Sequence, residues 1–235
     1  MNYNSEEKKI LRDKLSELQQ KVKEILLQAP SCHDLEHTLR VRENAAKLAE
    51  IENADALLID YAALLHDIAR PQELLSQGKT CHAKLGAEMA KSILKEIKIT
   101  NEQFIEKVAA CVRTHRYRNR GEELPESLEA KIVFDADKLD SLGAIGLARA
   151  FHFAGRIGAK VHNSKEKAIN SKSYSQEDSA YREYLVKLRY LPESMLTESG
   201  KKIATARLAF MRDFFEKLNK ECSGKDLTRH FTELY

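Results

Sequence analysis

Apolar residues recur every three or four positions along most of the chain, which is the spacing of amphipathic helices. No segment longer than a few residues alternates apolar and polar positions, as a half-buried strand would. The first helix is expected from about residue 5 to 27, with one apolar stripe made of Ile10, Leu11, Leu15, Leu18, Val22, Ile25 and Leu26. Pro30 ends it, and residues 31–34 are interpreted as the loop and cap before the next helix. The pattern therefore predicts an all-α fold.

Further helices follow from the same spacing and from the caps and prolines between them. They are expected at residues 35–53, from a cap at Asn53 or Asp55 to just before Pro71, and at 81–97, 101–115, 125–151, 176–189 and 192–219. Loops are expected at 72–79, 116–121 and 155–175. A loop as long as the last one is often functional or mobile. It either closes over a polyphosphate or is a disordered basic loop, with lysines Lys160, Lys165, Lys167 and Lys172.

The chain of 235 residues is 43% hydrophobic, which suffices for a sizeable core. We expect a single domain, in which an amphipathic helix at residues 1–29 packs on a core at 30–222 and a charged tail follows at 223–235. The first helix packs either on its own domain or on another subunit. Both a monomer and a homodimer therefore remain open.

Charge and composition exclude several classes of partner. The net charge of +3 is mild, and aromatic and basic residues are not interleaved, so we expect no nucleic-acid partner. No stretch approaches the ~18 apolar residues that cross a bilayer, and the charged N-terminus lacks a signal peptide. A cytoplasmic protein with no membrane partner is expected. Without a CxxC pair, the cysteines are expected as free thiols rather than a zinc-thiolate site: Cys32, Cys81, Cys111 and Cys222.

A nearly apolar helical stretch ends in the adjacent residues His66 and Asp67. On helical spacing His66 shares a face with Ile59, Ala62 and Ala63, so its imidazole is expected to point inward. An ionised Asp67 in such surroundings is costly unless an opposite charge compensates it. A divalent cation accepts imidazole nitrogen and carboxylate oxygen together. The simpler alternative is a hydrogen-bonded His–Asp pair that closes the helix.

Two more polar residues fall on faces that the apolar pattern predicts to be buried, namely His37 and Asp137. With His66 and Asp67 they would come from three helices, which is how metal sites in helical bundles are assembled. Two imidazoles and two carboxylates suit manganese, iron, cobalt or zinc, and leave positions open for water and substrate. The same segment contains two other acids, Asp135 and Asp140, for which a solvent-facing position is an open alternative. The choice of Asp137 therefore needs further support.

The ordered set His37, His66–Asp67 and Asp137 resembles the HD superfamily of metal-dependent phosphohydrolases. Three blocks extend the likeness to a small bacterial group that includes nucleotide pyrophosphohydrolases: His33-Asp34-x-x-His37-x-x-Arg40-Val41, Asp135-Ala136-Asp137-Lys138-Leu139-Asp140-x-Leu142-Gly143-Ala144-Ile145-Gly146, and Leu185-x-Lys187-Leu188 with Leu191-Pro192-x-x-Met195. The likeness covers about residues 30–220. It implies an HD-domain helical bundle at residues 30–222, in which the four residues are the metal ligands.

The chemistry implied by this resemblance is hydrolysis by metal-activated water, because a divalent ion lowers the pKa of bound water toward ~7 and polarises a phosphoryl oxygen. The expected ion is manganese, iron, cobalt, zinc or nickel, with magnesium as a further candidate. Asp67 would be both a ligand and the catalytic residue that orients the water. Phosphate charge needs cationic or hydrogen-bonding neighbours, and the candidates are Lys138, Arg70, Arg113 or Arg116, and His115. For each of the arginines, a solvated surface charge is an equally good interpretation.

Two histidines between the HD pair and the last aspartate, His82 and His115, resemble the extra ligands of HD proteins with two metals. They form a second metal site, or else His82 caps a helix and His115 donates to phosphate. One metal is usual in the group that the chain resembles. Asp34 and Glu36 either hold an imidazole in place or are acids at the N-terminus of a helix.

The leading functional interpretation is a phosphohydrolase that acts on a small phosphate ester or nucleotide and cleaves (deoxy)nucleoside triphosphates to monophosphate and pyrophosphate. A nucleoside 5′-monophosphate phosphatase is the near alternative, because the pocket decides between them. A di-iron HD-fold oxygenase is an alternative of another class and needs both His82 and His115 as ligands. The intact set of four candidate ligands disfavours a non-enzymatic nucleotide sensor. His152 and His162 have no matched partner and are expected at the surface or a pocket rim.

Overall fold

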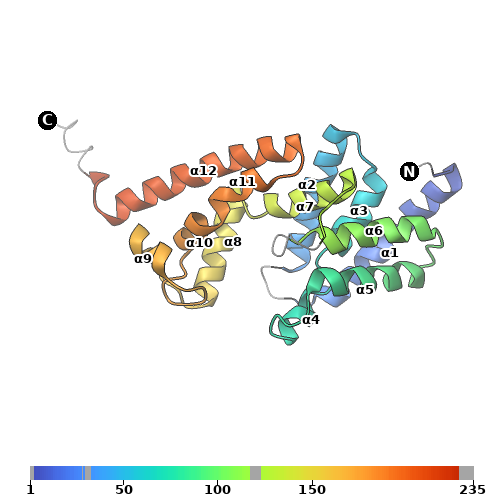
Figure 1. The fold of residues 1–235 in the computed structure, drawn as a ribbon, viewed down its shortest axis with the longest axis horizontal. Helices are drawn as coiled ribbons and strands as arrows, with labels where there is room; N and C mark the ends of the chain where they lie inside the picture. The colour runs from blue at the N-terminus through green and yellow to red at the C-terminus, as the bar shows by residue number, and fades with distance from the viewer. Residues whose placement is uncertain (1–2, 28, 30–32, 117–122, 228–235) are drawn as a thin grey trace. The chain divides into compact units, whose positions relative to one another are not determined.

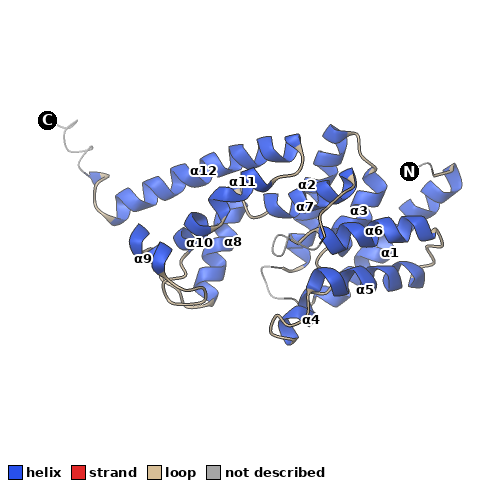
Figure 2. Ribbon diagram, in the orientation of Figure 1, coloured by secondary structure: helices blue, strands red, loops and turns tan. Residues whose placement is uncertain are grey.

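The computed structural model describes residues 3–27, 29, 33–116 and 123–227, and none of these residues forms a strand (Figures 1 and 2). The all-α prediction is confirmed. The predicted features at Pro30, Cys32 and residues 117–121, and the end of the predicted tail at 228–235, lie outside the described residues. The helices are α1 (Ser5–Leu26), α2 (Leu35–Glu52), α3 (Ala56–Leu65), α4 (Arg70–Leu75), α5 (His82–Glu96), α6 (Glu102–Thr114), α7 (Leu128–Leu139), α8 (Gly143–Arg156), α9 (Lys165–Asn170), α10 (Ala180–Val186), the 3-10 helix η1 (Leu188–Tyr190), α11 (Leu191–Ser194) and α12 (Glu198–Cys222).

The single helical domain contains two compact units. The first runs to Asp140 and includes Leu196–Gly200, and the second comprises Ser141–Met195 and the residues from Lys201 onward. The predicted boundaries at residues 29 and 222 stay predictions. Within the described residues, no helix is long and apolar enough to cross a membrane. The cysteines in that part of the chain, Cys81, Cys111 and Cys222, are free thiols, as predicted.

The first unit is built around α3, which is almost entirely buried. Its residues from Leu58 to Leu65 are apolar apart from Asp60 and the Tyr61 hydroxyl, and a helix that is apolar on nearly all sides must be covered on nearly all sides. Helices α1, α2, α6 and α7 all contact it. The Tyr61 hydroxyl donates to the Leu11 carbonyl at 2.6 Å, which fixes α1 against α3. Helix α1 therefore packs on its own unit.

The HD pair lies just beyond the end of α3, and not inside a longer helix as the pattern predicted. His66 is the C-cap of α3, and residues 66–69 form a turn. Pro71 then stands in the first turn of α4, where its missing N–H costs nothing. The predicted loop at 72–79 is consequently helical up to Leu75. This tight turn places Asp67 and Arg70 side by side.

The helix predicted over residues 125–151 is wrong, because the chain breaks between α7 and α8. Leu142 is extended, and Gly143 has φ +74°, a left-handed conformation that favours glycine. A Cβ at Gly143 would also meet the Arg207 side chain at 3.1 Å. The periodicity hides the break because apolar residues continue on both sides of it.

The predicted loop at residues 155–175 is partly helical, since it contains α9, and the structure orders it. Asn163 donates to the Glu177 carbonyl at 2.9 Å and accepts from Ser179 at 2.7 Å. Arg182 donates to the Ser171 carbonyl at 3.0 Å and to Asp178 at 3.0 Å. These bonds connect the segment to the N-terminal turn of α10 and to the residues just before it. That the loop lysines bind a polyphosphate stays a prediction.

The two last predicted helices, 176–189 and 192–219, are shorter or interrupted. The first is reduced to α10 followed by η1, and the second divides into α11 and α12. The interruption has a clear cause in the first unit, where Asp135 accepts from the backbone N–H groups of Leu196 and Thr197 at 2.9 and 2.8 Å. These donors are therefore satisfied by a side chain from α7 and not by a continuous helix.

Candidate metal centre

Three helix ends of the first unit carry the four predicted ligands. His37 stands in the first turn of α2, where the side chain of the N-cap Asp34 accepts from the His37 backbone N–H at 3.0 Å. His66 and Asp67 follow α3 directly, and Asp137 lies in the last turn of α7. Local caps and the turn after α3 thus fix the backbone of each candidate ligand.

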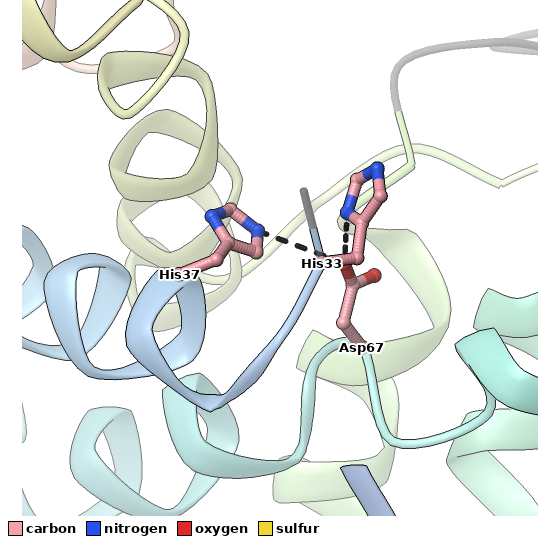
Figure 3. Close-up of side chains that lie close together, drawn as sticks. All are labelled: His33, His37 and Asp67. Atoms are coloured by element: carbon pink, nitrogen blue, oxygen red, sulfur yellow. Dashed lines mark hydrogen bonds and ion pairs between the residues drawn. The ribbon is translucent and has the colours of Figure 1, made fainter. Parts of the chain in front are cut away.

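The structure brings the four predicted ligands together. The Nε2 atoms of His37 and His66 lie 3.4 Å apart, and His37 Nε2 lies 3.4 Å from Asp137 Oδ1. Asp67 Oδ2 lies 3.6 Å from His37 Nε2 and 3.7 Å from His66 Nε2. Both imidazoles are fully buried, and Asp67 is 1% exposed. Figure 3 shows His37 and Asp67 facing one another. We call this group of donor atoms the first cluster.

Hydrogen bonds on the other ring nitrogens show that the donor set fits a cation. His66 Nδ1 bonds the Ala63 carbonyl at 2.8 Å, and a carbonyl only accepts, so Nδ1 carries the proton. His37 Nδ1 bonds Asp140 Oδ2 at 2.7 Å in the same way. The Nε2 lone pairs are left facing each other and two carboxylate oxygens. Electron-rich atoms converge, which a divalent cation would stabilise.

A second cluster lies on the other side of Asp67. Asp67 Oδ1 lies 3.3 Å from His115 Nε2 and 3.5 Å from His82 Nε2, and these two nitrogens are 3.2 Å apart. His115 Nδ1 donates to the Val112 carbonyl at 2.6 Å, so its Nε2 also presents a lone pair. Three such ligand atoms are enough to hold a metal ion. The carboxylate of Asp67 is therefore shared between two clusters.

Burial and nearby cations fix the charges of these groups. Burial lowers the pKa of His66 to about 4, so the ring is neutral at pH 7. Burial also lowers the pKa of His115. Burial by itself would raise the pKa of Asp67 and of Asp137, but Arg70 and Lys138 respectively hold them well below their usual range. The neutral imidazoles of His66 and His115 thus lie beside the ionised carboxylates of Asp67 and Asp137.

The predicted phosphate-binding cations are bound to site carboxylates. Arg70 Nε donates to Asp67 Oδ1 at 2.8 Å, while Lys138 Nζ donates to Asp137 Oδ2 at 2.5 Å and to the His115 carbonyl at 2.8 Å. Burial lowers the pKa of Lys138. The two remaining candidates lie on other partners: Arg113 pairs with Glu88 and Glu123, and Arg116 contacts Cys81 and Glu73.

The pattern missed His33, whose Nδ1 lies 2.8 Å from Asp67 Oδ2 (Figure 3). Burial, together with the charge of Arg70, lowers the pKa of His33 to about 4. The signal was present, because His33 opens the first family block. It was not read as a site residue because it precedes the helix and has no apolar face to share.

The structure excludes the alternative in which Asp135 and Asp140 face solvent, since both are buried. Asp140 accepts from His37 and from Arg40 Nε at 2.8 Å, so it holds the His37 ring. Asp135 holds the chain around Thr197 and has no direct contact with the clusters among the interactions described. Periodicity could not separate these acids, because burial of an acid depends on partners distant in sequence.

The remaining candidates have structural surroundings of their own. Asp34 is the N-cap of α2, and Glu36 is exposed in its first turn. His82 is the first residue of α5, but its ring is buried against His115 and does not cap the helix. In the second unit, His152 is exposed and His162 bonds Asn219 Oδ1 at 2.7 Å.

Comparison with known proteins places this geometry in a family context. The model of the HD domain family matches residues 34–142. YpgQ of Bacillus subtilis (strain 168) is 34% identical over 207 residues, covering 87% of this chain and 92% of that protein. Among solved structures, YpgQ in complex with ADP has a TM-score of 0.69 at 27% identity, with 90% of this chain and 96% of that chain covered.

A predicted HD superfamily hydrolase from an uncultured Thermotogales bacterium has a TM-score of 0.64 at 31% identity, with 88% of this chain and 92% of that chain covered. An HD-superfamily hydrolase from Bacillus thuringiensis has a TM-score of 0.69 at 29% identity, with 91% and 98% covered. These similarities extend well beyond the stretch that the family model matches, so they include most of the second unit.

Proposed function

Because the chain belongs to the HD-domain family of metal-dependent phosphohydrolases, we propose that it hydrolyses a nucleotide with one divalent transition metal held by the first cluster. The observation that carries this proposal is the convergence of two Nε2 lone pairs and two carboxylate oxygens from His37, His66, Asp67 and Asp137. Such a mixed nitrogen and oxygen set suits manganese, iron, cobalt, zinc or nickel better than an all-oxygen ion such as magnesium.

The proposed substrate is a (deoxy)nucleoside triphosphate, cleaved to monophosphate and pyrophosphate. Support comes from the similarity to YpgQ, whose structure was solved in complex with ADP. A nucleotide carrying more than one phosphate therefore fits a protein of the same fold. The near alternative, hydrolysis of nucleoside 5′-monophosphates, differs in the bond that is cleaved and is separated by its product.

The residues of the first cluster have distinct proposed roles. When bound, the ion would supply a Lewis acid that lowers the pKa of water and polarises a phosphoryl oxygen. Asp67 is the proposed catalytic residue, as a ligand that also orients the attacking water. The Ala63 carbonyl and Asp140 keep the His66 and His37 rings in the tautomer that presents Nε2. The His33 side chain is 27% exposed and is therefore a candidate for contacting the substrate phosphate.

The test is an activity screen on metal-free protein resupplied with manganese, cobalt, nickel, zinc or magnesium. Deoxynucleoside and ribonucleoside tri- and monophosphates are the substrates, and the products are resolved as phosphate or pyrophosphate. His66→Ala removes a ligand, whereas His162→Ala is the matched control because His162 lies in the second unit and bonds Asn219. We expect metal-dependent release of pyrophosphate that only His66→Ala abolishes.

Two other outcomes would change the assignment. Release of phosphate from monophosphates alone would replace the proposed reaction by the phosphatase alternative. Full activity in His66→Ala would overturn the proposed metal centre itself. Because both variants alter a histidine, a loss of activity confined to His66→Ala is not explained by a general effect of removing an imidazole.

A further inference from the structure

The second cluster already contains a cation, the guanidinium of Arg70. Arg70 Nε donates to Asp67 Oδ1 at 2.8 Å, and this oxygen is the same atom that faces His82 and His115. A second nitrogen of Arg70, Nη1, donates to Glu73 Oε2 at 2.8 Å. Glu73 Oε2 also lies 3.0 Å from His82 Nδ1. Arg70 is thus held from two sides beside the donor atoms of the second cluster.

The first cluster also has a cation nearby, Lys138, but this cation bonds the carboxylate oxygen that does not face the imidazoles. Lys138 bonds Asp137 through Oδ2, whereas the Asp137 oxygen that faces His37 is Oδ1. Lys138 therefore leaves Asp137 Oδ1 available to an ion.

The other donor oxygen of the first cluster, Asp67 Oδ2, is bonded at 2.8 Å by His33, whose lowered pKa makes it neutral at pH 7. Arg70, in contrast, places a permanent positive charge directly on the donor oxygen Asp67 Oδ1. An ion in the second cluster would have to share Asp67 Oδ1 with a guanidinium that is always charged.

We propose that Arg70 takes the place of a second metal ion and so sets the stoichiometry at one ion per chain. This inference rests on the proposed function, because it presupposes an ion in the first cluster. The planar guanidinium supplies one positive charge at Asp67 Oδ1 and repels a divalent ion at close range. Glu73 keeps it there, since Glu73 contacts both Arg70 and His82. His82 and His115 form a site that would bind metal if the arginine were absent.

The test is a Mn²⁺ titration of metal-free wild type and Arg70→Gln, by calorimetry and by elemental analysis after dialysis. Wild type is expected to bind one ion. Arg70→Gln is expected to bind a second, with the dissociation constant of that second ion lowered at least ~10-fold, because the repulsion at this distance is strong. The affinity of the first ion should change less, since Arg70 bonds Oδ1 and the first cluster uses Oδ2.

Matched variants keep this test specific. Arg113→Gln removes an arginine that pairs only at 3.8 Å with Glu88 and Glu123 in the interactions described, so it should bind one ion like wild type. Arg70→Lys retains the charge and should also bind one ion. Arg70→Gln combined with His82→Gln should lose the second ion again. Circular dichroism shows whether each variant keeps its helices.

The outcomes separate this inference from the proposed function. If wild type binds two ions of similar affinity, or if folded Arg70→Gln still binds one, Arg70 does not set the stoichiometry, and the first cluster remains the proposed centre. If folded wild type binds no Mn²⁺ in any concentration range, the proposed metal centre fails and the role of Arg70 fails with it. If Arg70→Gln does not fold, two ions on Arg70→Lys would equally contradict the inference.

Discussion

The two carboxylate oxygens of Asp67 have nearly the same neighbours but different sources of positive charge. Oδ2 faces the Nε2 atoms of His37 and His66, and Oδ1 faces those of His82 and His115. Oδ2 is also bonded by the neutral imidazole of His33 at 2.8 Å. In both pairs, protein acceptors hold at least one ring through its Nδ1 atom. Only on the Oδ1 side does a guanidinium bond the donor oxygen directly.

Under the proposal for Arg70, the position of this cation, and not the type of ligand alone, decides which cluster binds an ion. Each cluster contains two imidazoles and one oxygen of Asp67, and the first cluster adds the carboxylate of Asp137. Both contain a group of three side chains that could hold a metal ion. Two features distinguish them: Asp137 adds a carboxylate to the first cluster, and Arg70 bonds the Asp67 oxygen of the second. Three kinds of change test the comparison, in order of decreasing expected effect. They remove the shared carboxylate, change the charge of a ring, or remove one outer carboxylate.

The largest effect is expected from Asp67→Asn, which removes the charge that both clusters share. Phosphohydrolase activity should fall at least about 10³-fold, equivalent to ~4 kcal/mol, because metal binding and orientation of the water are lost together. Activity is measured at saturating Mn²⁺ on protein whose helical content has been checked. Glu36→Gln is the control, since Glu36 is an exposed acid on the same helix as His37.

Asp67→Asn also tests whether the clusters share one residue. Calorimetry should show that Asp67→Asn does not bind the first ion. The double variant Asp67→Asn, Arg70→Gln should also lack the second ion that Arg70→Gln alone is expected to bind. If Asp67→Asn with Arg70→Gln still bound an ion at His82 and His115, the two clusters would be independent. The account of Asp67 as a common ligand would then be wrong.

A smaller effect is expected from pH in the metal-free protein. His66 has a pKa of about 4 when folded, below the usual value of 6.5, so between these values the unfolded chain binds more protons than the folded one. Its contribution to the free energy of unfolding is complete above pH 6.5 and is lost as the pH falls toward 4. The loss due to His66 is roughly 3 kcal/mol over this window.

Urea unfolding in the presence of a chelator, at intervals between pH 7 and pH 4, measures this dependence. The slope contains other groups, so the relevant quantity is the difference between wild type and His66→Gln. That difference should shrink as the pH falls. Bound Mn²⁺ should move the loss of stability of the wild type to lower pH, since protons and metal compete for Nε2. A difference independent of pH would contradict a neutral, buried His66.

The sequence predicted several of the helices and four candidate ligands that lie close together in the structure, but not the partners of these residues. Periodicity located α1, α2, α5 and α6 because each has one apolar face. It ran α7 and α8 together, because Gly143 breaks the helix through its backbone conformation while apolar residues continue. Burial of Asp140 depends on Arg40 and His37, about a hundred positions away, and no local pattern contains that information.

The same limit explains the incomplete prediction for Arg70. Its charge indicated a role in binding phosphate, and its position after the HD pair indicated proximity to the site. The sequence does not show that the turn at residues 66–69 directs its Nε to Asp67 Oδ1. Helical spacing predicts faces, whereas the direction of a long side chain beyond a turn depends on the acceptors available there, here Asp67 and Glu73.

The smallest predicted effect compares the outer carboxylates of the two clusters, Asp140 and Glu73. Asp140→Asn should weaken the first Mn²⁺ about 10- to 100-fold, because the charge that holds the His37 ring in its tautomer is lost. Glu73→Gln should leave the first ion within about threefold of wild type, since Glu73 contacts His82 and Arg70 and belongs to the other side of Asp67. Calorimetry at pH 7 measures both. Equal losses in the two variants would mean that the clusters act as one network, and the distinction between the two oxygens of Asp67 would have no energetic meaning.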